Sequence, residues 1–434
     1  MSLPTVPVEE AVARLEPVDT LAFPLGPGQP GGFLHALAGR DDWQDLSLYG
    51  ALLVDLYEVV TKPGVRYLSG FFGPAERFLR DSGAAVEFVP GDFRRFAPIL
   101  QGQGPRVMCT VATPPDADGL MSLSLHAGAS VGELRRCGAD PDRLLVVEIN
   151  ERFPRTFGVE PEYTHALHVD EADLIVESDR PPFVLAEVEP TDIERDIAEL
   201  ASRYIVDGST LQTGIGGIPS VLATLLAEGD GGDYGVHSEM FTTGLMRLHQ
   251  AGKVANRRKG VYDGYSVSTF AAGTEELYEF LDGNHDVRFL PVQLVNSPEV
   301  IAANRRFVSI NGALAVDLAG QVVADSLDGR QFSGIGGHED FLAGAGLEIE
   351  DRSLICLRSS TTVDGRSVSR IVPGLPAGTI VTTPRHQVDV IITEHGVAEL
   401  QGRTVRERAR ALDAIAHPDH RDALAEAAER WPVD

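Results

Sequence analysis

A single carboxylate follows a glycine-rich turn near the middle of the sequence. Glu239 lies in the apolar block 235–241 (GVHSEMF), which comes after the turn 214–219 (GIGGIP). Glycine permits positive φ and close approach of a ligand to the backbone, and the start of the helix expected after this turn favours anions. A carboxylate beside backbone N–H donors has the groups that covalent acyl chemistry requires. Taken singly, the turn also fits an ordinary strand-to-helix connection, and Glu239 also fits a surface residue or an ion pair.

A second turn with the same beginning, 334–337 (GIGG), occurs later in the half that contains Glu239. Two such loops could face one ligand from two sides, and the backbone N–H groups near Ile215 and Gly337 are our candidates for holding an oxyanion. Neither turn is a P-loop, because Gly-Lys-Ser/Thr is missing. The dinucleotide pattern Gly-x-Gly-x-x-Gly occurs at 26–31, but two prolines and the lack of a convincing preceding strand argue against that role. The candidate binding residues are Gly214, Ile215, Gly216, Gly217, Ile218, Gly336 and Gly337.

Two other residues compete with Glu239 for a catalytic role. Glu394 has a similar setting in 392–396 (ITEHG). Ser130 lies in 128–132 (GASVG), which matches the Gly-x-Ser-x-Gly elbow of serine hydrolases and follows an alternating run. A chain with 45 glycines can match that short pattern by chance. The residues alone leave both alternatives open.

Histidines and basic residues near the block could bind a metal ion or phosphates. At a period of two, His237 and Glu239 share one face of an extended segment. No His-x-x-x-His on a helix and no cysteine–histidine set is present, so no metal site is predicted. The basic cluster could meet phosphates or could be a solvated loop, which we favour; it consists of Lys253, Arg257, Arg258 and Lys259.

Composition narrows the class of protein. The net charge of −27 over 434 residues argues against a nucleic-acid-binding protein. Three cysteines without metal-ligand spacing fit a reducing compartment. The sequence shows neither a signal peptide nor an apolar run of about 18 residues. We therefore expect a cytoplasmic protein that does not insert into a membrane.

Short β-branched runs alternate with segments of helical period, which predicts an α/β architecture with largely parallel sheets. The acidic, proline-containing segment 187–192, in which Thr191 or Asp192 could cap the following helix, predicts a boundary near residue 190, and hence the domains 1–190 and 191–434. The expected strands are 51–56, 106–111, 144–149, 210–212, 289–292, 307–310, 353–357, 379–382 and 388–392. The expected helices are 8–15, 31–38, 192–205, 220–227, 274–281 and 405–414, with a capping helix in the C-terminal tail.

With these segments the chain resembles the acetyl-CoA hydrolase/transferase family, which includes 4-hydroxybutyrate and butyrate:acetate CoA-transferases among the family I CoA-transferases. The sequence departs from the family pattern at 242–244 (TTG), where relatives often have Ser-Asp-Gly, and at 360–365, which lacks an expected lysine. The similar segments are 114–119, 150–158, 211–219, 235–241, 336–341, 369–373, 381–385, 393–398 and 415–418.

The resemblance implies two similar open α/β domains with an active site in the cleft between them. It makes Glu239 the catalytic residue, places CoA along 214–218 and at 336–337, gives Asn311 a supporting role beside His237, and gives Ser130 none. The implied activity is CoA transfer from a short-chain acyl-CoA to a carboxylic acid through a glutamyl-CoA thioester. The alternatives are hydrolysis by the same glutamate and non-catalytic acyl-CoA binding. We expect no tightly bound cofactor, acyl-CoA and a short-chain carboxylate as substrates, and a homodimer.

Overall fold

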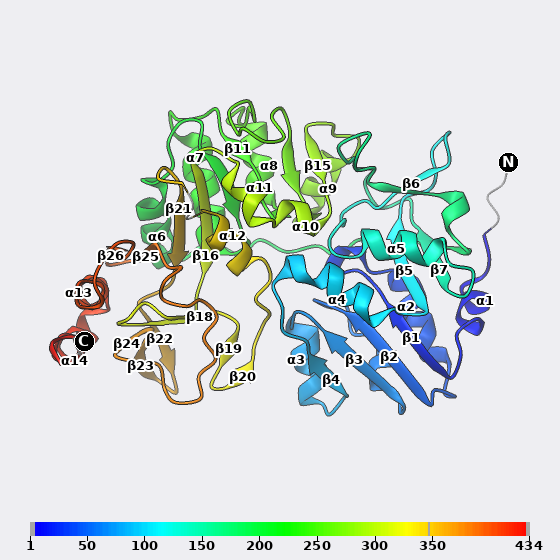
Figure 1. Cartoon of the computed structure of the whole chain (residues 1–434), viewed down its shortest axis with the longest axis horizontal. Helices are drawn as coiled ribbons and strands as arrows, with labels where there is room; N and C mark the ends of the chain where they lie inside the picture. Colours follow the sequence, from blue (N-terminus) through cyan, green and yellow to red (C-terminus); the bar gives the residue numbers. More distant parts are fainter. Residues whose placement is uncertain (1–4, 346–347, 431–434) are drawn as a thin grey trace. The chain divides into compact units, whose positions relative to one another are not determined.

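The computed structural model describes residues 5–345 and 348–430, which form two compact units (Figure 1). The first unit comprises the chain up to Ala186 together with Val267–Val295, and the second comprises Glu187–Ser266 together with the chain from Asn296. The break at Ala186 lies near the joint expected at residue 190. The segment Val267–Val295 differs from the expected division, because its backbone pairs with the first unit: the Ala127 N–H donates to the Thr269 carbonyl at 2.8 Å. The domain limits 1–190 and 191–434 stay a prediction.

The first unit contains an open parallel sheet in the order β4-β3-β2-β1-β5-β7-β9. Its inner strands β5 and β7 are buried along their whole length, as expected for parallel strands covered on both faces. The strands are β1 Val18–Ala22, β2 Asp45–Gly50, β3 Val65–Ser69, β4 Val86–Phe88, β5 Val107–Ala112, β7 Leu144–Ile149 and β9 Leu174–Glu177, with the smaller β6 Leu120–Ser122, β8 Ala166–His168, β14 Phe270–Ala271 and β15 Val287–Phe289.

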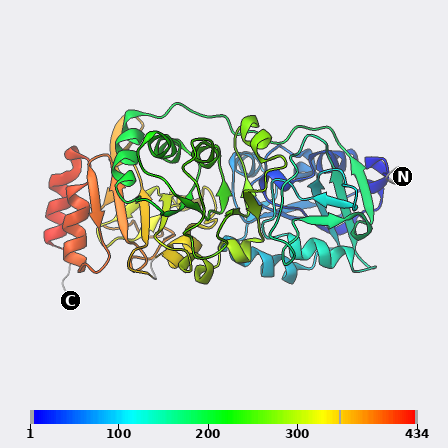
Figure 2. The same cartoon turned by 90° about the horizontal axis from the view of Figure 1, so that it is seen from above.

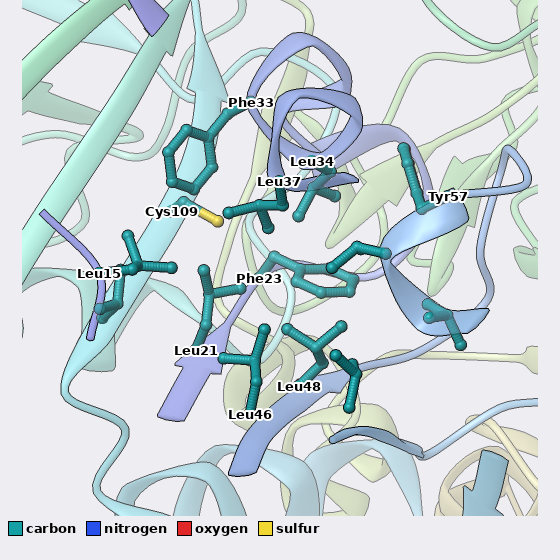
Figure 3. Packing of buried hydrophobic residues seen from close by; sticks show 14 of the residues in the cluster. Leu15, Leu21, Phe23, Phe33, Leu34, Leu37, Leu46, Leu48, Tyr57 and Cys109 are labelled. Carbon is teal, nitrogen blue, oxygen red and sulfur yellow. The ribbon is translucent and has the colours of Figure 1, made fainter. Parts of the chain in front are cut away.

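Short helices connect these strands, and one of them closes the main apolar core of the unit. Phe33, Leu34 and Leu37, from α2 and the turn after it, point toward Leu21 of β1 and Leu48 of β2 (Figure 3). All five side chains are buried. The helices are α1 Val8–Ala13, α2 Gly31–Ala36, α3 Pro74–Asp81, α4 Phe96–Gln103, α5 Val131–Gly138, α9 Glu275–Leu281 and α10 Val292–Val295.

The second unit contains an open sheet in the order β11-β10-β16-β21-β25-β26. Its pairs are parallel except for the final hairpin of β25 and β26. The strands are β10 Thr210–Thr213, β11 Gly235–Val236, β16 Phe307–Gly312, β21 Arg352–Cys356, β25 Val390–Thr393 and β26 Gly396–Glu399, with smaller ones at β12 Met240–Phe241, β17 Ala315–Asp317, β18 Val322–Val323, β19 Ser326–Leu327, β20 Arg330–Gln331, β22 Ser360–Val363, β23 Arg366–Ser369 and β24 Ile371–Val372, while β13 Ser266–Ser268 spans the joint.

Helices pack on this sheet and at its end. Helices α6 and α7 lie side by side, and α13 with α14 packs beside β26, as Figure 2 shows in a second view. The threonine at residue 191 caps α6 through a reciprocal capping box with Glu194, as the sequence indicated. None of the helices within residues 5–345 and 348–430 has the length and apolar character of a membrane span. The helices are α6 Asp192–Ser202, α7 Gly217–Glu228, α8 Thr243–Gln250, α11 Pro298–Ala302, α12 His338–Ala345, α13 Val405–Ala414 and α14 Pro418–Glu429.

The α/β class with mostly parallel sheets is confirmed, and so is each expected helix, although several ends differ. Three expected strands are wrong. Residues 51–56 are a turn after β2, because Leu52 adopts a positive φ of 45°. Residues 289–292 join the end of β15 to α10 across Pro291, which cannot donate to a ladder. Residues 379–382 are a loop whose Thr382 N–H donates to the Val322 carbonyl.

Two buried histidines of the first unit make stability depend on pH. Burial lowers the pKa of His126 to about 3 and that of His165 to about 4. The unfolded chain, with an ordinary histidine pKa near 6.5, therefore binds more protons below that pH. We expect the free energy of unfolding to fall by about 2 kcal/mol for each of these histidines between pH 7 and pH 5. Urea unfolding of His126→Phe should show a smaller loss over this range than the wild type; an equal loss would contradict the assignment.

Candidate active site

Glu239 lies in the second unit, directly between β11 and β12. Glu239 as a whole is partly exposed, whereas its carboxylate contacts two hydrogen-bond donors. The Asn296 amide nitrogen Nδ2 donates to Oε2 at 2.7 Å, and the Gly337 backbone N–H also donates to the carboxylate. Segments that follow α10 and precede α12 therefore meet at the Glu239 carboxylate.

Gly337 has to be glycine because the carboxylate occupies the place of a side chain. A Cβ atom at this position would lie 1.9 Å from Glu239 Oε2 and 2.4 Å from Asn296 Nδ2. Contacts this short do not occur between real atoms, so any side chain would displace the carboxylate or the amide. The sequence predicted that the Gly336-Gly337 turn allows close approach to the backbone, and the structure shows the approaching group to be Glu239 itself.

The Asn296 amide bridges two acidic side chains. Besides Glu239 it donates to Asp340 Oδ2 at 3.1 Å. Asn296 and Asp340 are both fully buried, and Asp340 belongs to the first turn of α12. An amide NH₂ carries two hydrogens, so one group can serve both carboxylates at once. The two carboxylates are thereby held close together.

This environment raises the pKa of Glu239 from 4.5 to about 8. Burial is the largest cause, and the negative charge of Asp340 acts in the same direction, while the hydrogen bonds from Asn296 and Gly337 oppose the rise. A carboxylate with this pKa is a stronger base than an ordinary one when it is ionised. Strong perturbation by burial together with a specific charged neighbour is characteristic of functional sites.

A row of rings connects the segments that carry these groups. His237 is fully buried, stacks on Tyr262 with centroids 6.5 Å apart, and meets Phe307 of β16 edge-on at 6.3 Å. Phe307 in turn stacks on Phe341 of α12 at 6.1 Å. The row thus links the segment before Glu239 to the helix after Gly337. Since β11 ends at Val236, the strand periodicity predicted for His237 and Glu239 does not extend to the carboxylate.

The first glycine turn has the strand–turn–helix setting that was expected for it. β10 ends at Thr213, and Gly216 adopts a φ of 119° immediately before α7. Ile215 at its tip is 54% exposed. A Cβ atom on Gly217 would lie 2.5 Å from the Glu194 carboxyl carbon, so a side chain there would displace the end of the Glu194 side chain. Contact of Gly214–Ile218 with CoA stays a prediction.

Asn311 hydrogen-bonds to two polar side chains of the second unit, and its supporting role in the active site stays a prediction. Its Nδ2 donates to Ser309 Oγ at 2.8 Å and to Gln212 Oε1 at 3.4 Å. Asn296 is the amide that contacts Glu239, and sequence reasoning missed it because its setting before Ser297 and Pro298 is that of an ordinary helix start. Asp340 lies in the segment 336–341, which resembles the family, but it was not assigned a role from the sequence.

The competing carboxylate and serine have local partners. Glu394 accepts hydrogen bonds from the Ser359 N–H at 2.9 Å and from Ser359 Oγ at 2.5 Å. Burial acts to raise the pKa of Glu394, but these hydrogen bonds outweigh it and the pKa is lowered. Ser130 is buried, and its Oγ donates at 3.5 Å to the Ala127 carbonyl of its own turn. Both contacts are those expected of structural residues.

The basic cluster is bound to its own surroundings. Arg257 and Arg258 both pair with Asp233 at 2.7 Å, and Lys253 and Lys259 each donate to two backbone carbonyls. These contacts argue against phosphate binding. Arg257 and Arg258 are exposed, as expected for the solvated loop that we favoured, but Lys259 is buried, so that expectation is wrong for Lys259. In the part of the chain that the structure describes, histidine, cysteine and acidic side chains form no group of three or more suited to a metal ion.

Comparison with known proteins identifies relatives of this chain. A model of the acetyl-CoA hydrolase/transferase C-terminal domain matches residues 273–428. The chain is 36% identical over 426 residues to succinyl-CoA:cyclohexane-1-carboxylate CoA transferase of Geobacter metallireducens, covering 97% of this chain and 94% of the relative. It is also 36% identical to 4-hydroxybutyrate coenzyme A transferase of Clostridium kluyveri, covering 96% of each chain. An acetyl-CoA hydrolase of Eremothecium gossypii is 31% identical over 51% of this chain and 40% of its own length.

A solved structure extends the similarity to the whole fold. RipA from Yersinia pestis superposes with a TM-score of 0.88 at 31% identity, covering 99% of each chain.

The contribution of Asp340 to the pKa of Glu239 can be measured directly. Asp340→Asn removes the neighbouring negative charge, so the pKa of Glu239 should fall clearly below that of the wild type. A carbodiimide labels protonated carboxyl groups, and mass spectrometry of Glu239 labelling across pH 5 to 9 would report the midpoint. Asp389→Asn, which removes another buried carboxylate of the same unit, serves as the control. An unchanged midpoint in Asp340→Asn would show that burial alone raises the pKa.

Proposed function

The chain belongs to the acetyl-CoA hydrolase/transferase family, and on this basis we propose that it transfers CoA between a short-chain acyl-CoA and a carboxylic acid through a glutamyl-CoA thioester at Glu239. The observation that supports this most strongly is the enclosed carboxylate, with its donors Asn296 and Gly337 and a pKa near 8. The names of the relatives are those of enzymes, so we set aside non-catalytic binding. A cytoplasmic location, a homodimer and the lack of a tightly bound cofactor complete the proposal.

The first half of the reaction replaces one thioester by another. An ionised Glu239 oxygen attacks the thioester carbonyl, the carbon–sulfur bond breaks, and CoA leaves as a thiolate while an acyl-glutamyl anhydride forms. The thiolate then attacks the glutamyl carbonyl and expels the acyl carboxylate, which leaves a glutamyl-CoA thioester. A second carboxylate runs these two steps in reverse. Neither the acyl group nor the glutamyl group is transferred to water, so the free energy of the thioester is largely kept.

Asn296 and Gly337 suit the step that takes place at the glutamyl carbonyl. When the thiolate attacks this carbon, negative charge develops on the glutamyl carbonyl oxygen. In the free enzyme both donors already contact the oxygens of this carboxylate. Donors fixed in advance at such an oxygen contribute about 3 to 4 kcal/mol each to the transition state. Among the sequence-based candidates, this argument supports Gly337 as a donor. The corresponding role of Ile215, at the substrate carbonyl, stays part of the proposal.

Hydrolysis is the second candidate, and the similarity to an acetyl-CoA hydrolase favours keeping it. It would use the same Glu239, with water taking the place of the second carboxylate at the anhydride or at the enzyme thioester. The two reactions differ in whether an acid is needed to consume acyl-CoA.

Glu239→Gln should lower turnover by about a thousandfold or more, because the nucleophile is lost while the shape of the side chain is kept. The assay follows acetyl-CoA with and without propionate, butyrate, succinate or 4-hydroxybutyrate. Acid-dependent formation of a new acyl-CoA identifies a transferase, and acid-independent release of thiol identifies a hydrolase. Glu394→Gln is the matched control and should stay close to wild type. Wild-type turnover in Glu239→Gln would exclude Glu239 as the nucleophile.

Gly337→Ala should lower turnover by at least about a hundredfold, because the added methyl group occupies the space of the carboxylate and its amide donor. Gly374→Ala is the control, since a Cβ atom there would meet nothing within 4 Å. Steady-state rates and thermal midpoints of both variants should be compared. A Gly337→Ala enzyme with wild-type kcat would mean that the observed carboxylate position is not the reactive one.

A further inference from the structure

The strand that leads into Glu239 lies at the edge of its sheet. β11 pairs with β10 on one side: the Gly235 N–H donates to the Ser209 carbonyl at 2.9 Å, and the His237 N–H to the Leu211 carbonyl at 3.1 Å. Successive residues of a strand direct their backbone groups to opposite sides. The N–H and C=O of Val236 therefore face away from β10, where a buried and unpaired peptide group would be unfavourable.

Two side chains take the place of the missing neighbouring strand. Asn256 Oδ1 accepts the Val236 N–H at 2.9 Å. Lys259 Nζ donates to the Val236 carbonyl at 2.8 Å and to the Tyr265 carbonyl at 2.7 Å. Val236 and Lys259 are both fully buried. The backbone N–H and C=O of one residue, three positions before Glu239, are thus both held by side chains.

We propose that Lys259 is a positioning residue: together with Asn256 it fixes the outer edge of β11 and thereby the backbone that presents Glu239. The inference rests on the proposed function of Glu239. The mechanism above gives this lysine no role. Burial of an amine is unfavourable unless hydrogen bonds compensate for the lost contact with water.

The local packing is built around the lysine stem. A Cβ atom on Gly235 would lie 2.4 Å from Lys259 Cγ and 3.0 Å from its Cδ, so the glycine makes room for the side chain beside the strand. Burial lowers the pKa of Lys259 to about 7, with Asp263 opposing the shift. A neutral amine still carries two N–H groups, which equals the number of carbonyls it contacts, so these hydrogen bonds persist in both protonation states.

Lys253 offers a matched control in the same unit. Its Nζ also donates to two backbone carbonyls, those of Gly229 and Gly231, but these follow the end of α7 instead of leading into Glu239. Replacing either lysine by methionine removes the donors and keeps most of the side-chain length. A general effect of losing a lysine would therefore appear in both variants.

The test compares Lys259→Met with Lys253→Met at a temperature where circular dichroism shows both to be folded. For Lys259→Met we expect kcat to fall about tenfold or more with KM for acyl-CoA within about twofold, because the nucleophile is misplaced while substrate binding is kept. Hydrogen exchange of the peptide covering 234–241 should be faster. Lys253→Met should match the wild type in kcat and in the exchange of that peptide.

Gly235→Ala provides a second route, since its methyl group would push the lysine stem away. It should reproduce the loss of kcat, and combining it with Lys259→Met should add little. Wild-type kcat and exchange in Lys259→Met would overturn the inference, and if that variant does not fold, wild-type kcat in Gly235→Ala would do so. A wild-type enzyme without turnover of any acyl-CoA would instead refute the proposed function, while the exchange measurement would still test the contact.

Discussion

The site depends on one buried amide that serves two acidic side chains. Asn296 donates to Glu239 at 2.7 Å and to Asp340 at 3.1 Å. Two enclosed carboxylates repel each other and are poorly solvated, which raises the pKa of Glu239. The amide and the Gly337 N–H limit this rise and fix the direction of the carboxylate. The result is an acidic group that ionises near neutral pH and is held in one orientation.

The surrounding fold keeps these partners together. Glu239 follows the edge strand β11, Gly337 precedes α12, and Asp340 belongs to the first turn of that helix. The rings of His237, Phe307 and Phe341 connect the strand, the sheet and the helix in one packed row. Rigid elements of this kind hold reacting groups more closely than loops do. Small errors in the position of a reacting group lower rates strongly.

Several features of the fold followed directly from local patterns. Buried parallel strands give continuous apolar runs, so 144–149 was predicted with its observed bounds as β7. The cap at Thr191 was also visible, because its side chain bonds within its own turn. The strand expected at 51–56 was wrong, since a positive φ at Leu52 ends the extended backbone and apolar composition does not report φ. The segment Val267–Val295 pairs with residues far earlier in the chain, and no local pattern encodes such pairing.

The sequence by itself offered Glu239 as a candidate nucleophile beside Glu394 and Ser130, and the family resemblance carried by its motifs favoured Glu239, because residue type and spacing are local properties. Only the tertiary structure decided which groups contact the carboxylate. Asn296 lies 57 positions away from Glu239 and 44 from Asp340, and no local pattern in the sequence links these residues. The tertiary structure also decided that Lys259 is buried against the block 235–241 and not part of a solvated loop. Hydrogen-bond direction and burial depend on how distant segments pack, which is why the sequence could offer a candidate carboxylate but not its partners.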